Sequence, residues 1–499
     1  MDPAKPSLEL LRALTDEHVL RALMREGRLT RAELATATGV SKPTAGESVR
    51  RLVAAGLVAD TGQRTPGGRG RGRVGSYYSL AADIGLALAV SIAPEGVVAE
   101  CVDAYGGVVS RSEQPVDRPA RPNQVAAALR AAATQVVTGQ AATGQAVATQ
   151  AAAGQAVATQ AAAGRTVAGK NAVTPAPVVP TTPEGPATSE APAGPAATVP
   201  AITAVPATTA ISAALAVSAP TPTPAIQETP AIPAATTISA TSVDPAAPAV
   251  GTVVNGLGGP VRLAVVSAAD PVDRVSGRMV HLPDSPFLLG DLDPVDVLAP
   301  LVAGPVTVDN DVNWAARAER AAAADEDAPL DDFAYLYLGE GLGCAVVSDG
   351  EVRRGHHGLS GEIAHLLTVG PEGRATSLID IFGELGLRQP GATAIDTPRL
   401  LAAVTETPAT LATIAQAVAG AIAAIVALTD PAQIVLGGPW GARPLVAGAI
   451  TAAVAELPRP VPVRPAHLTA EPSLAGAREA TLTRLQSAIV TQAQPTSAT

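Results

Sequence analysis

The sequence predicts an α/β protein in which a small helical module precedes an α/β body and a low-complexity segment interrupts that body. Short apolar runs alternate with helical stretches over residues 76–135 and 251–490. Two helix-start signals lie within residues 1–75, and Ala, Thr and Pro dominate residues 136–250. A chain of 499 residues has room for two to four domains of about 150 residues each.

Charge is distributed unevenly along the chain. The first 75 residues hold 13 Lys and Arg against 8 Asp and Glu, and the rest of the chain holds 21 against 37. The net charge is therefore +5 in the N-terminal part and −16 in the rest, within a total of −11. This asymmetry predicts nucleic-acid binding at the N-terminal end and argues against it elsewhere.

Nothing in the sequence indicates export or membrane insertion. The two cysteines, Cys101 and Cys344, are too few for a disulfide scaffold or an all-cysteine zinc site. The N-terminus is charged and then amphipathic, unlike a signal peptide, which predicts a cytoplasmic location. The apolar stretch between Glu406 and Asp430 raises the alternative of a membrane span, but its alanine content and Gln416 favour a buried helix.

Residues 136–250 lack what a folded core requires. They contain no aromatic residue, and a ten-residue unit, GQAVATQAAA, begins at Gly144 and again at Gly154. Two copies and a frayed third are too few for a solenoid, and the Pro- and Thr-rich remainder favours extended backbone. We interpret the segment as a disordered insertion, with a spacer role favoured over partner binding.

The body is expected to form one unit from residues 76–135 and 251–490, with a mostly covered sheet. Strands are predicted at residues 87–92, 97–102, 261–266, 306–308, 333–338 and 434–436. Helices are predicted at residues 124–135, 314–324, 377–385, 399–404 and 411–428.

The N-terminal module has the pattern of a helix-turn-helix. A first amphipathic helix ends at Gly27, and Thr30 with Glu33 forms a capping box for a second helix. Gly39 permits the tight turn, and Ser41 is a good N-cap for the third helix. The apolar residues available for one face of the first helix are Leu11, Leu14, Val19, Leu20, Leu23 and Met24.

Two strand-like segments, residues 57–58 and 77–80, follow the third helix and are joined by an arginine- and glycine-rich loop. This order predicts a wing whose arginines contact phosphates or a narrow minor groove. The alternative is a small packing module with a solvated basic loop. The wing candidates are Arg64, Arg69, Arg71 and Arg73. The third helix offers Ser41, Lys42, Thr44 and Ala45 to base edges and Arg50 and Arg51 to phosphates.

Three stretches of the body carry chemistry-bearing residues. Residues 338–347 read LGEGLGCAVV and follow a predicted strand, so their glycines allow close backbone approach to a ligand. Residues 355–365 form a glycine-rich loop that ends in Glu362 and His365. Residues 308–313, VDNDVN, place Asn310 and Asp311 at the end of a strand, where ligands of open α/β folds collect.

Together these motifs resemble the ROK family of repressors and sugar kinases over most of the chain outside the insertion. GEIAH resembles the family's G-E-x-G-H sugar motif, with Ala364 in place of glycine, and VDNDVN resembles its N-D-x-N segment. The resemblance implies a two-lobed sugar-kinase-like body of the actin and hexokinase type. It also implies nucleotide or phosphate loops at Gly339, Gly341, Gly343, Gly437 and Gly438.

The resemblance implies that Asn310, Asp311, Glu362 and His365 bind sugar hydroxyls, and that Asp311 would be the general base of a kinase. Each residue has a local alternative. Asp311 could cap the following helix, Asn310 could stabilise a turn, and His365 could be a hydrogen-bonded histidine of the core.

Two departures from the family pattern argue against catalysis and metal binding. The family's D-x-G-G-T phosphate turn is matched to residues 83–87, which keep Asp83 and Gly85 but replace Gly-Thr by Leu86 and Ala87. Residues 366–378 contain no cysteine, although many family members bind zinc there. We therefore expect a vestigial phosphate loop, no catalytic residue, no metal and no cofactor.

The resulting hypothesis is a sugar-responsive transcriptional regulator, with repression favoured, that binds a double-stranded DNA operator as a homodimer or higher homo-oligomer. Its effector would be a carbohydrate or sugar phosphate bound by a non-catalytic body. One alternative is an active ATP-dependent sugar kinase with a DNA-binding appendage. Another is a DNA-binding protein whose body serves oligomerisation alone.

Overall fold

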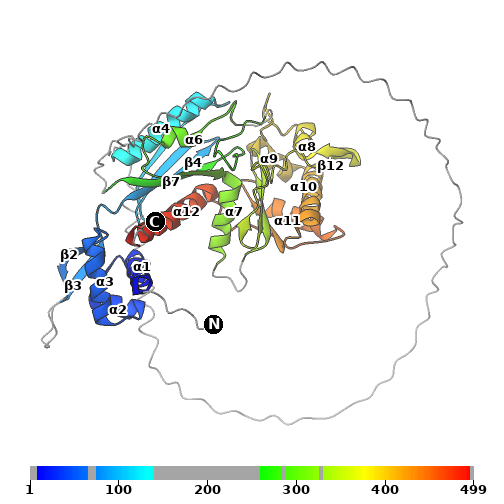
Figure 1. Ribbon diagram of the computed structural model, residues 1–499. Coiled ribbons are helices and arrows are strands. Elements are labelled where there is room, and N and C mark those ends of the chain that lie inside the picture. The colour runs from blue at the N-terminus through cyan, green and yellow to red at the C-terminus, as the bar shows by residue number, and fades with distance from the viewer. Residues whose placement is uncertain (1–7, 66–74, 140–258, 283–286, 325–329, 495–499) are drawn as a thin grey trace, which may run out of the picture. The chain divides into compact units, whose positions relative to one another are not determined.

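The computed structural model describes residues 8–65, 75–139, 259–282, 287–324 and 330–494 (Figure 1). The chain divides into two compact units, one made of Met1–Gly144 and Pro248–Thr499 and the other of Gln145–Ala247. The second unit lies outside the described residues, and so does the predicted disordered insertion apart from residues 136–139. Those four residues complete a helix that ends at a left-handed Gly139.

Three helices and a small sheet form the N-terminal module. Its helices are α1 (Leu8–Glu26), α2 (Arg31–Thr38) and α3 (Lys42–Ala54). Its strands are β1 (Arg28–Thr30), β2 (Val58–Arg64) and β3 (Ser76–Leu80), in the order β1-β3-β2. The capping box of Thr30 and Glu33 is present, and Gly39 takes the left-handed conformation that ends α2. These local predictions are confirmed.

The module differs from its predicted form in two respects. Strand β3 pairs with both β1 and β2, so the sheet of the module extends past residue 75 to Leu80. Leu11 and Leu14 were expected on the packed face of the first helix but are 47% and 43% exposed. The packed face begins later, because the α1 residues that reach the core are Val19, Leu20, Ala22, Leu23 and Met24.

The first lobe of the body is a five-stranded sheet with helices on both faces. The sheet order is β6-β5-β4-β7-β8, and β4, β7 and β8 run parallel. Figure 1 shows α4 along one face of this sheet and α12 along the other. The elements are β4 (Leu86–Ala93), β5 (Gly96–Val102), β6 (Val108–Gln114), α4 (Pro122–Thr138), β7 (Val261–Ala268), α6 (Pro294–Leu298), β8 (Val306–Asn310) and α12 (Pro472–Ala493).

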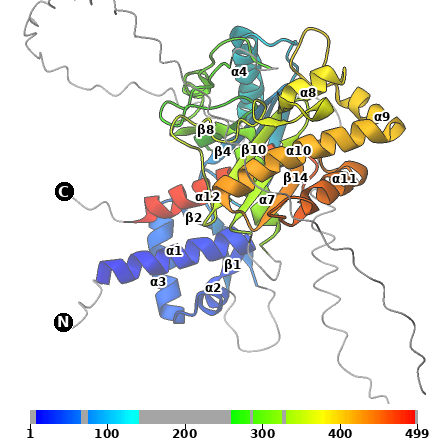
Figure 2. The ribbon, with the colours of Figure 1, turned by 90° about the vertical axis from the view of Figure 1, so that its right-hand side faces the viewer.

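The second lobe is built around another five-stranded sheet, in the order β11-β10-β9-β14-β15. One face packs against α7 (Asp311–Ala322), and α9, α10 and α11 gather on the other (Figure 2). The elements are β9 (Phe333–Leu338), β10 (Leu342–Ser348), β11 (Glu351–Val352), β12 (Leu367–Val369), η1 (Pro371–Gly373), β13 (Ala375–Ser377), α8 (Leu378–Glu384), α9 (Thr397–Glu406), α10 (Pro408–Thr429), β14 (Gln433–Gly437), α11 (Pro444–Ala455) and β15 (Val463–Pro465).

Helix α10 is the apolar stretch that raised the alternative of a membrane span. It is the one helix of the described residues that is long and apolar enough to cross a bilayer, and half of its most apolar window is buried. Ile414, Val418 and Ile422 belong to the core of the second lobe, and the Thr368 hydroxyl donates to the Ala417 carbonyl at 2.7 Å. The structure therefore uses α10 as a core helix of this lobe.

Helix α12 was not predicted, yet it contacts both the first lobe and the N-terminal module. It packs against β4 and β7, against α7, and against α1 of the N-terminal module. Its Leu485 and Ile489 lie in one hydrophobic cluster with Val19 and Leu20 of α1. The helix was missed because its apolar residues are diluted by Ala, Thr and Arg and produce only a weak amphipathic pattern.

Candidate functional site

The N-terminal end of α3 exposes three of the four residues expected to face base edges. The Ser41 hydroxyl caps the helix by accepting a 3.3 Å hydrogen bond from the Thr44 amide. Ser41, Lys42 and Thr44 are exposed. Ala45 is completely buried in the hydrophobic core of the module, so the expectation that it contacts bases is wrong.

The two arginines further along α3 have different surroundings. Arg50 is exposed and pairs with Glu47 one turn earlier. Arg51 instead forms two bonds to the Asp16 carboxylate, Nε to Oδ2 at 3.0 Å and Nη2 to Oδ1 at 2.6 Å. Asp16 is 6% exposed and also accepts from Ser48. This pair with a buried carboxylate makes Arg51 a tie between α3 and α1 and leaves fewer of its donors for a phosphate than the expected role requires.

Of the predicted wing arginines, the structure describes one. Arg64 ends β2, is exposed, and lies 2.9 Å from the Asp60 carboxylate. Arg69, Arg71 and Arg73 lie outside the described residues.

Two exposed arginines near the sheet of the module were missed. The guanidinium of Arg28 lies 5.6 Å from the centre of the Tyr77 ring, and that of Arg31 lies 5.1 Å from the Tyr78 ring. Both belong to the segment RLTR that surrounds the capping box, so their positive charge was visible in the sequence. Their nearness to β3 was not, because it depends on the pairing of β1 with β3.

In the body, the parallel strands bring several polar side chains to one end of the first sheet. Ile92 of β4 pairs with Ala268 of β7, which in turn pairs with Asn310 of β8. Asn310 is the N-cap of α7, and its Oδ1 accepts from the Val312 amide at 3.0 Å while its Nδ2 donates to the Asp270 carbonyl at 3.3 Å. The capping role considered for Asp311 therefore belongs mainly to Asn310.

Asp311, the first residue of α7, has a strongly perturbed carboxyl group. Burial raises its pKa from an ordinary value of 3.8 to about 7, although its Oδ1 accepts a 2.8 Å bond from the Val312 amide that lowers the pKa. The nearby carboxylates of Glu362, Asp270 and Glu95 raise the pKa further. Asp311 is thus partly protonated at neutral pH and surrounded by other acids.

The predicted sugar motif is divided between two environments. Glu362 is exposed and close enough to Asp311 for its charge to affect the Asp311 pKa. His365 is also exposed, and its charge acts on Asp380 of α8, where hydrogen bonds from Ser377 and then Arg388 are the main causes of a lowered pKa. The core position considered for His365 is therefore not observed. No group of His, Cys, Asp and Glu within the described residues is arranged to hold a metal ion.

Gly361 determines how the loop that carries Glu362 docks on the second sheet. Its φ is +99°, and any Cβ at this position would lie 1.8 Å from the Cys344 carbonyl oxygen. The Cys344 amide donates to the Gly361 carbonyl at 2.9 Å. A glycine is needed here because the backbone of the loop lies directly against β10.

The turn that was matched to the family's phosphate loop lies at the wrong end of the first sheet. Asp83 and Gly85 precede β4, whereas Asp311 lies beyond the opposite, C-terminal ends of the parallel strands. The side chain of Arg262 covers Gly85, and its Nε donates to the Ile84 carbonyl. The match was misleading because it compared residue types without their place relative to the sheet.

The turn that does lie beside Asp311 is the hairpin between β4 and β5. It contains Pro94 and Glu95, and the charge of Glu95 affects the pKa of both Asp311 and Tyr337. Arg118 holds this hairpin to the second lobe. Its Nε donates to the Pro94 carbonyl at 2.9 Å, and its Nη1 lies 2.6 Å from the Glu340 carboxylate.

The glycines of the second lobe meet where the β9–β10 turn approaches the end of β14. Any Cβ at Gly437 would lie 2.0 Å from the Tyr335 hydroxyl, and one at Gly438 would lie 2.4 Å from the Leu338 carbonyl oxygen. Gly343 packs against α7, where a Cβ would lie 2.7 Å from the Val312 side chain. The Gly339 amide donates to the Gly341 carbonyl at 3.1 Å and closes the turn. Close packing thus accounts for Gly343, Gly437 and Gly438, whereas nothing lies within 4 Å of a Cβ added at Gly341.

Tyr337, at the end of β9, is a site residue that the sequence analysis missed. Burial is the main cause of its raised pKa, and the charges of Asp311, Glu95 and Glu340 raise it further. Its phenol therefore stays protonated at neutral pH and can donate a hydrogen bond into the same region. A tyrosine within an apolar strand has no distinguishing sequence signal.

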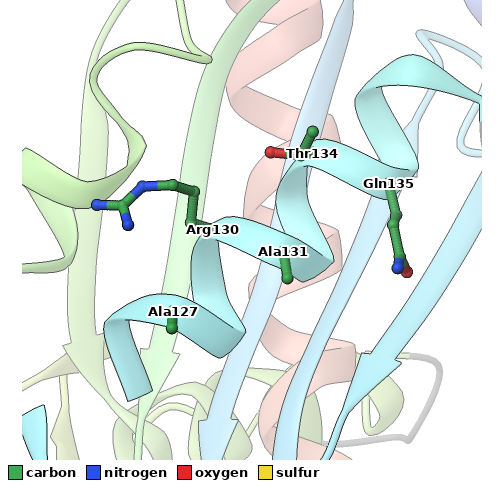
Figure 3. Close-up of a pocket in the computed structure, with 5 residues that line it drawn as sticks. All are labelled: Ala127, Arg130, Ala131, Thr134 and Gln135. Atoms are coloured by element: carbon green, nitrogen blue, oxygen red, sulfur yellow. The ribbon is translucent and has the colours of Figure 1, made fainter. Parts of the chain in front are cut away.

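A shallow surface pocket lies elsewhere, on the outer side of α4 (Figure 3). Its polar lining residues are Arg130, Thr134 and Gln135, and the other lining residues are Ala127 and Ala131. It contains none of the predicted site residues.

Both the N-terminal module and the body resemble known protein families. The pattern of the winged helix-turn-helix DNA-binding family matches residues 12–59, and that of the ROK family matches residues 217–377. The chain thus contains a segment similar to the ROK family and, before it, a segment similar to the winged helix-turn-helix family. A glucokinase of Halalkalibacterium halodurans is 42% identical over 71 residues, which are 14% of this chain and 21% of that enzyme. The match thus spans about a fifth of the length of this curated relative.

One solved structure supports the fold of the body and the N-terminal module together. A ROK family transcriptional regulator, a homologue of the E. coli Mlc protein, has a TM-score of 0.50 at 15% identity, covering 96% of this chain and 99% of that one. A ROK family glucokinase from Streptomyces griseus, in complex with glucose and AMPPNP, has a TM-score of 0.44 at 16% identity, covering 80% and 100%. At 15% identity, the first comparison establishes the fold.

Proposed function

We propose that this protein is a DNA-binding transcriptional regulator, a repressor by preference, whose ROK-family body binds a carbohydrate or sugar phosphate and transfers no phosphate. The β4–β5 hairpin turn beside Asp311 is the main support for the absence of phosphate transfer. A phosphate cradle requires backbone amides and close approach of the chain. Pro94 has no amide hydrogen, and Glu95 places a negative charge near Asp311. Both features disfavour a triphosphate at this position.

The residues at the end of β8 suit sugar hydroxyls. Asn310 offers an amide, and Asp311 and Glu362 offer carboxylates, which together donate to and accept from vicinal hydroxyl groups. A neutral ligand also avoids the repulsion that this acidic region would exert on an anion. His365 remains part of the proposal as a residue that contacts the sugar from the end of its loop.

A continuous set of packed helices supports a route from this site to the DNA-binding module. Helix α7 begins at Asp311 and lies against α12 so closely that a Cβ at Gly476 would be 2.0 Å from the Trp314 carbonyl oxygen. Helix α12 in turn shares a hydrophobic cluster with α1. A sugar-induced shift of α7 would change the spacing of the two DNA-binding modules in a homodimer and weaken one half-site contact.

The decisive experiment measures binding to the DNA upstream of the gene, by gel shift or fluorescence anisotropy, with and without a panel of carbohydrates. We expect an effective sugar to weaken DNA binding at least tenfold. Asp311→Ala and Glu362→Ala should bind DNA normally and lose this response. Glu351→Ala, an exposed acid on β11, should respond as the wild type does. A full response in both site variants would place the effector elsewhere.

The DNA-binding part of the proposal has its own test. Replacing Arg69 and Arg71 by Ala should lower affinity for all sequences and flatten the dependence on salt, because fewer counterions are released. Lys42→Ala should instead lower the preference for the operator over unrelated DNA. Arg353→Ala, on the body, serves as the matched control. An unchanged salt slope in the double variant would remove the wing from the interface.

One observation favours the alternative of an active sugar kinase. A carboxyl group with a pKa of about 7, as Asp311 has, is well suited to accept a proton from a sugar hydroxyl near neutral pH. Transfer of phosphate from ATP to a panel of hexoses and amino sugars tests this directly. Turnover that disappears in Asp311→Ala would reverse the order of the two proposals.

A further inference from the structure

Three arginines converge on the face of β8 that is turned toward α7 and α12. Thr307 and Asp309 are two residues apart on this strand, so their side chains lie on the same face. The Asp309 Oδ2 atom accepts from Arg317 Nη1 at 2.9 Å and lies 3.1 Å from Arg354 Nε. Arg484 of α12 donates from Nη1 to the Thr307 hydroxyl.

The charges of this cluster do not balance. Arg317 and Arg354 share a single oxygen of Asp309, and Arg484 contacts a neutral hydroxyl. These contacts give three guanidinium groups one carboxylate, which leaves two positive charges in excess. Burial lowers the pKa of Arg484, and the charges of Arg317 and Arg354 lower it further.

The cluster is sheltered but remains open to solvent. The side chains of Arg317 and Arg354 are 26% and 32% exposed, whereas that of Asp309 is 5% exposed. The Arg317 guanidinium also lies 4.5 Å from the centre of the Trp314 ring, which limits its motion. Positive charges held together in a half-buried place repel one another, and an added anion would relieve that repulsion.

We propose that Arg317, Arg354 and Arg484 form a binding site for a dianionic phosphate group, either free phosphate or a phosphate monoester. Two excess positive charges match a dianion, and the planar donors of guanidinium groups match the oxygens of phosphate. Arg354 follows β11 of the second sheet, whereas Arg317 and Arg484 lie on α7 and α12. A bound phosphate would therefore hold the loop of the second lobe to the two helices.

This site goes beyond the proposed sugar site and uses none of its residues. Asn310 and Asp311 lie among carboxylates that would repel a phosphate, whereas Asp309 is already neutralised by arginines. An experiment can therefore contradict the phosphate site and still support the sugar site, or the reverse.

Isothermal titration of the full-length protein at pH 7.5 and low chloride tests the proposal. The probes are inorganic phosphate and glucose 6-phosphate, with glucose as the uncharged comparison. Inorganic phosphate should bind the wild type with a Kd of about 1 mM or tighter. Arg317→Gln and Arg484→Gln should weaken it at least tenfold. Arg320→Gln is the matched control, because Arg320 lies on the same helix but pairs with Asp331. Asp311→Ala should keep phosphate binding.

The two anionic probes distinguish the source of the phosphate. Tighter binding of glucose 6-phosphate than of inorganic phosphate identifies a phosphate monoester, and equal binding identifies free phosphate. Thermal melting without anion verifies that the variants fold. If Arg484→Gln does not fold, Arg484→Lys is the substitute. Lysine keeps the positive charge but lacks the two parallel N–H donors of a guanidinium, so this variant should fold and bind phosphate with intermediate affinity.

Three results would overturn the proposal. The first is no heat of binding with either phosphate up to about 10 mM, a concentration that saturates a site of the expected affinity. The second is equal binding of phosphate by the wild type and by both site variants, Arg317→Gln and Arg484→Gln. The third is a loss of affinity for DNA in Arg484→Gln without any loss of phosphate binding, which would assign the cluster to the DNA interface.

Discussion

The two ends of strand β4 differ in a way that affects the interpretation of the whole body. At its N-terminal end, Asp83 and Gly85 resemble a phosphate-binding turn, yet Arg262 covers Gly85 and the turn lies away from Asp311. At its C-terminal end, Pro94 and Glu95 have no resemblance to such a turn, yet they lie beside Asp311. A short motif is informative only with its position in the sheet, because parallel strands gather their functional residues at their carboxyl ends.

The structure changes the reason to expect no catalysis, but the expectation itself stays the same. The sequence analysis relied on Leu86 and Ala87, which are ordinary buried residues of β4. The structure moves the argument to the β4–β5 hairpin, where a proline and an acid stand in place of amide and hydroxyl donors. Four substitutions test whether the turn before β4 is structural and whether the turn after β4 belongs to the proposed site.

The largest effect is expected for Gly85→Ala. Its φ of +106° and a Cβ placed 2.4 Å from Arg262 Nε should lower the free energy of unfolding by about 1–3 kcal/mol. Urea unfolding measures this, with Gly448→Ala on α11 as the control, where nothing lies within 4 Å of the added Cβ. The sugar response of the folded variant should be normal. A stable Gly85→Ala protein that has lost the response would make this turn functional.

The next effect concerns the pH dependence caused by Asp311. Its folded pKa of about 7 exceeds the ordinary 3.8, so the folded state holds the proton more tightly. That stabilisation is complete below about pH 4 and is lost as the pH rises through about 7. Asp311→Asn should flatten this decline and be more stable than the wild type at pH 8 by about 1 kcal/mol or more.

Thermal melting across pH 4 to 8 measures the Asp311 effect. Asp349→Asn is the control, because Asp349 is 84% exposed in its pair with Arg353. An Asp311→Asn protein whose stability follows the wild-type pH curve would show that Asp311 is not buried among acids.

A smaller effect is expected for Glu95→Gln. Removing this charge should lower the pKa of Asp311 slightly, because Glu95 is the last of the causes that raise it, after burial, Glu362 and Asp270. The midpoint of the pH-dependent stability should move down by the same amount. Glu113→Gln, on β6 of the same sheet, should leave the midpoint unchanged. If the midpoint of the pH-dependent stability does not move in Glu95→Gln, the β4–β5 hairpin is not part of the site around Asp311.

The smallest effect is expected for Asp83→Asn. Asp83 is exposed at the far end of β4, so the sugar response and phosphate binding should change less than twofold. Titrations of both ligands measure this. A tenfold loss of either would restore the first assignment of the phosphate turn.

Much of the fold could be predicted from the sequence, but the surroundings of individual site residues could not. The alternation of strands and helices indicated the body, and the motif around Asn310 and Asp311 indicated a strand end followed by a helix. The burial of Ala45 and the pairing of Arg51 with Asp16 were not predictable, because both depend on how α3 packs against α1. The arginine cluster leaves no local pattern, because it joins Thr307 to Arg484, 177 positions away, and Asp309 to Arg354 in another lobe.

The sequence by itself determined where helices of the N-terminal module begin and end. The capping box of Thr30 and Glu33 and the left-handed Gly39 act over three or four residues, so neighbouring side chains are sufficient. Tertiary structure alone decided which turn lies beside Asp311, which carboxylates raise its pKa, and that α12 lies between α7 and α1. Those features arise from the parallel pairing of β4, β7 and β8 and from helix packing, both of which join distant segments whose meeting no local pattern encodes.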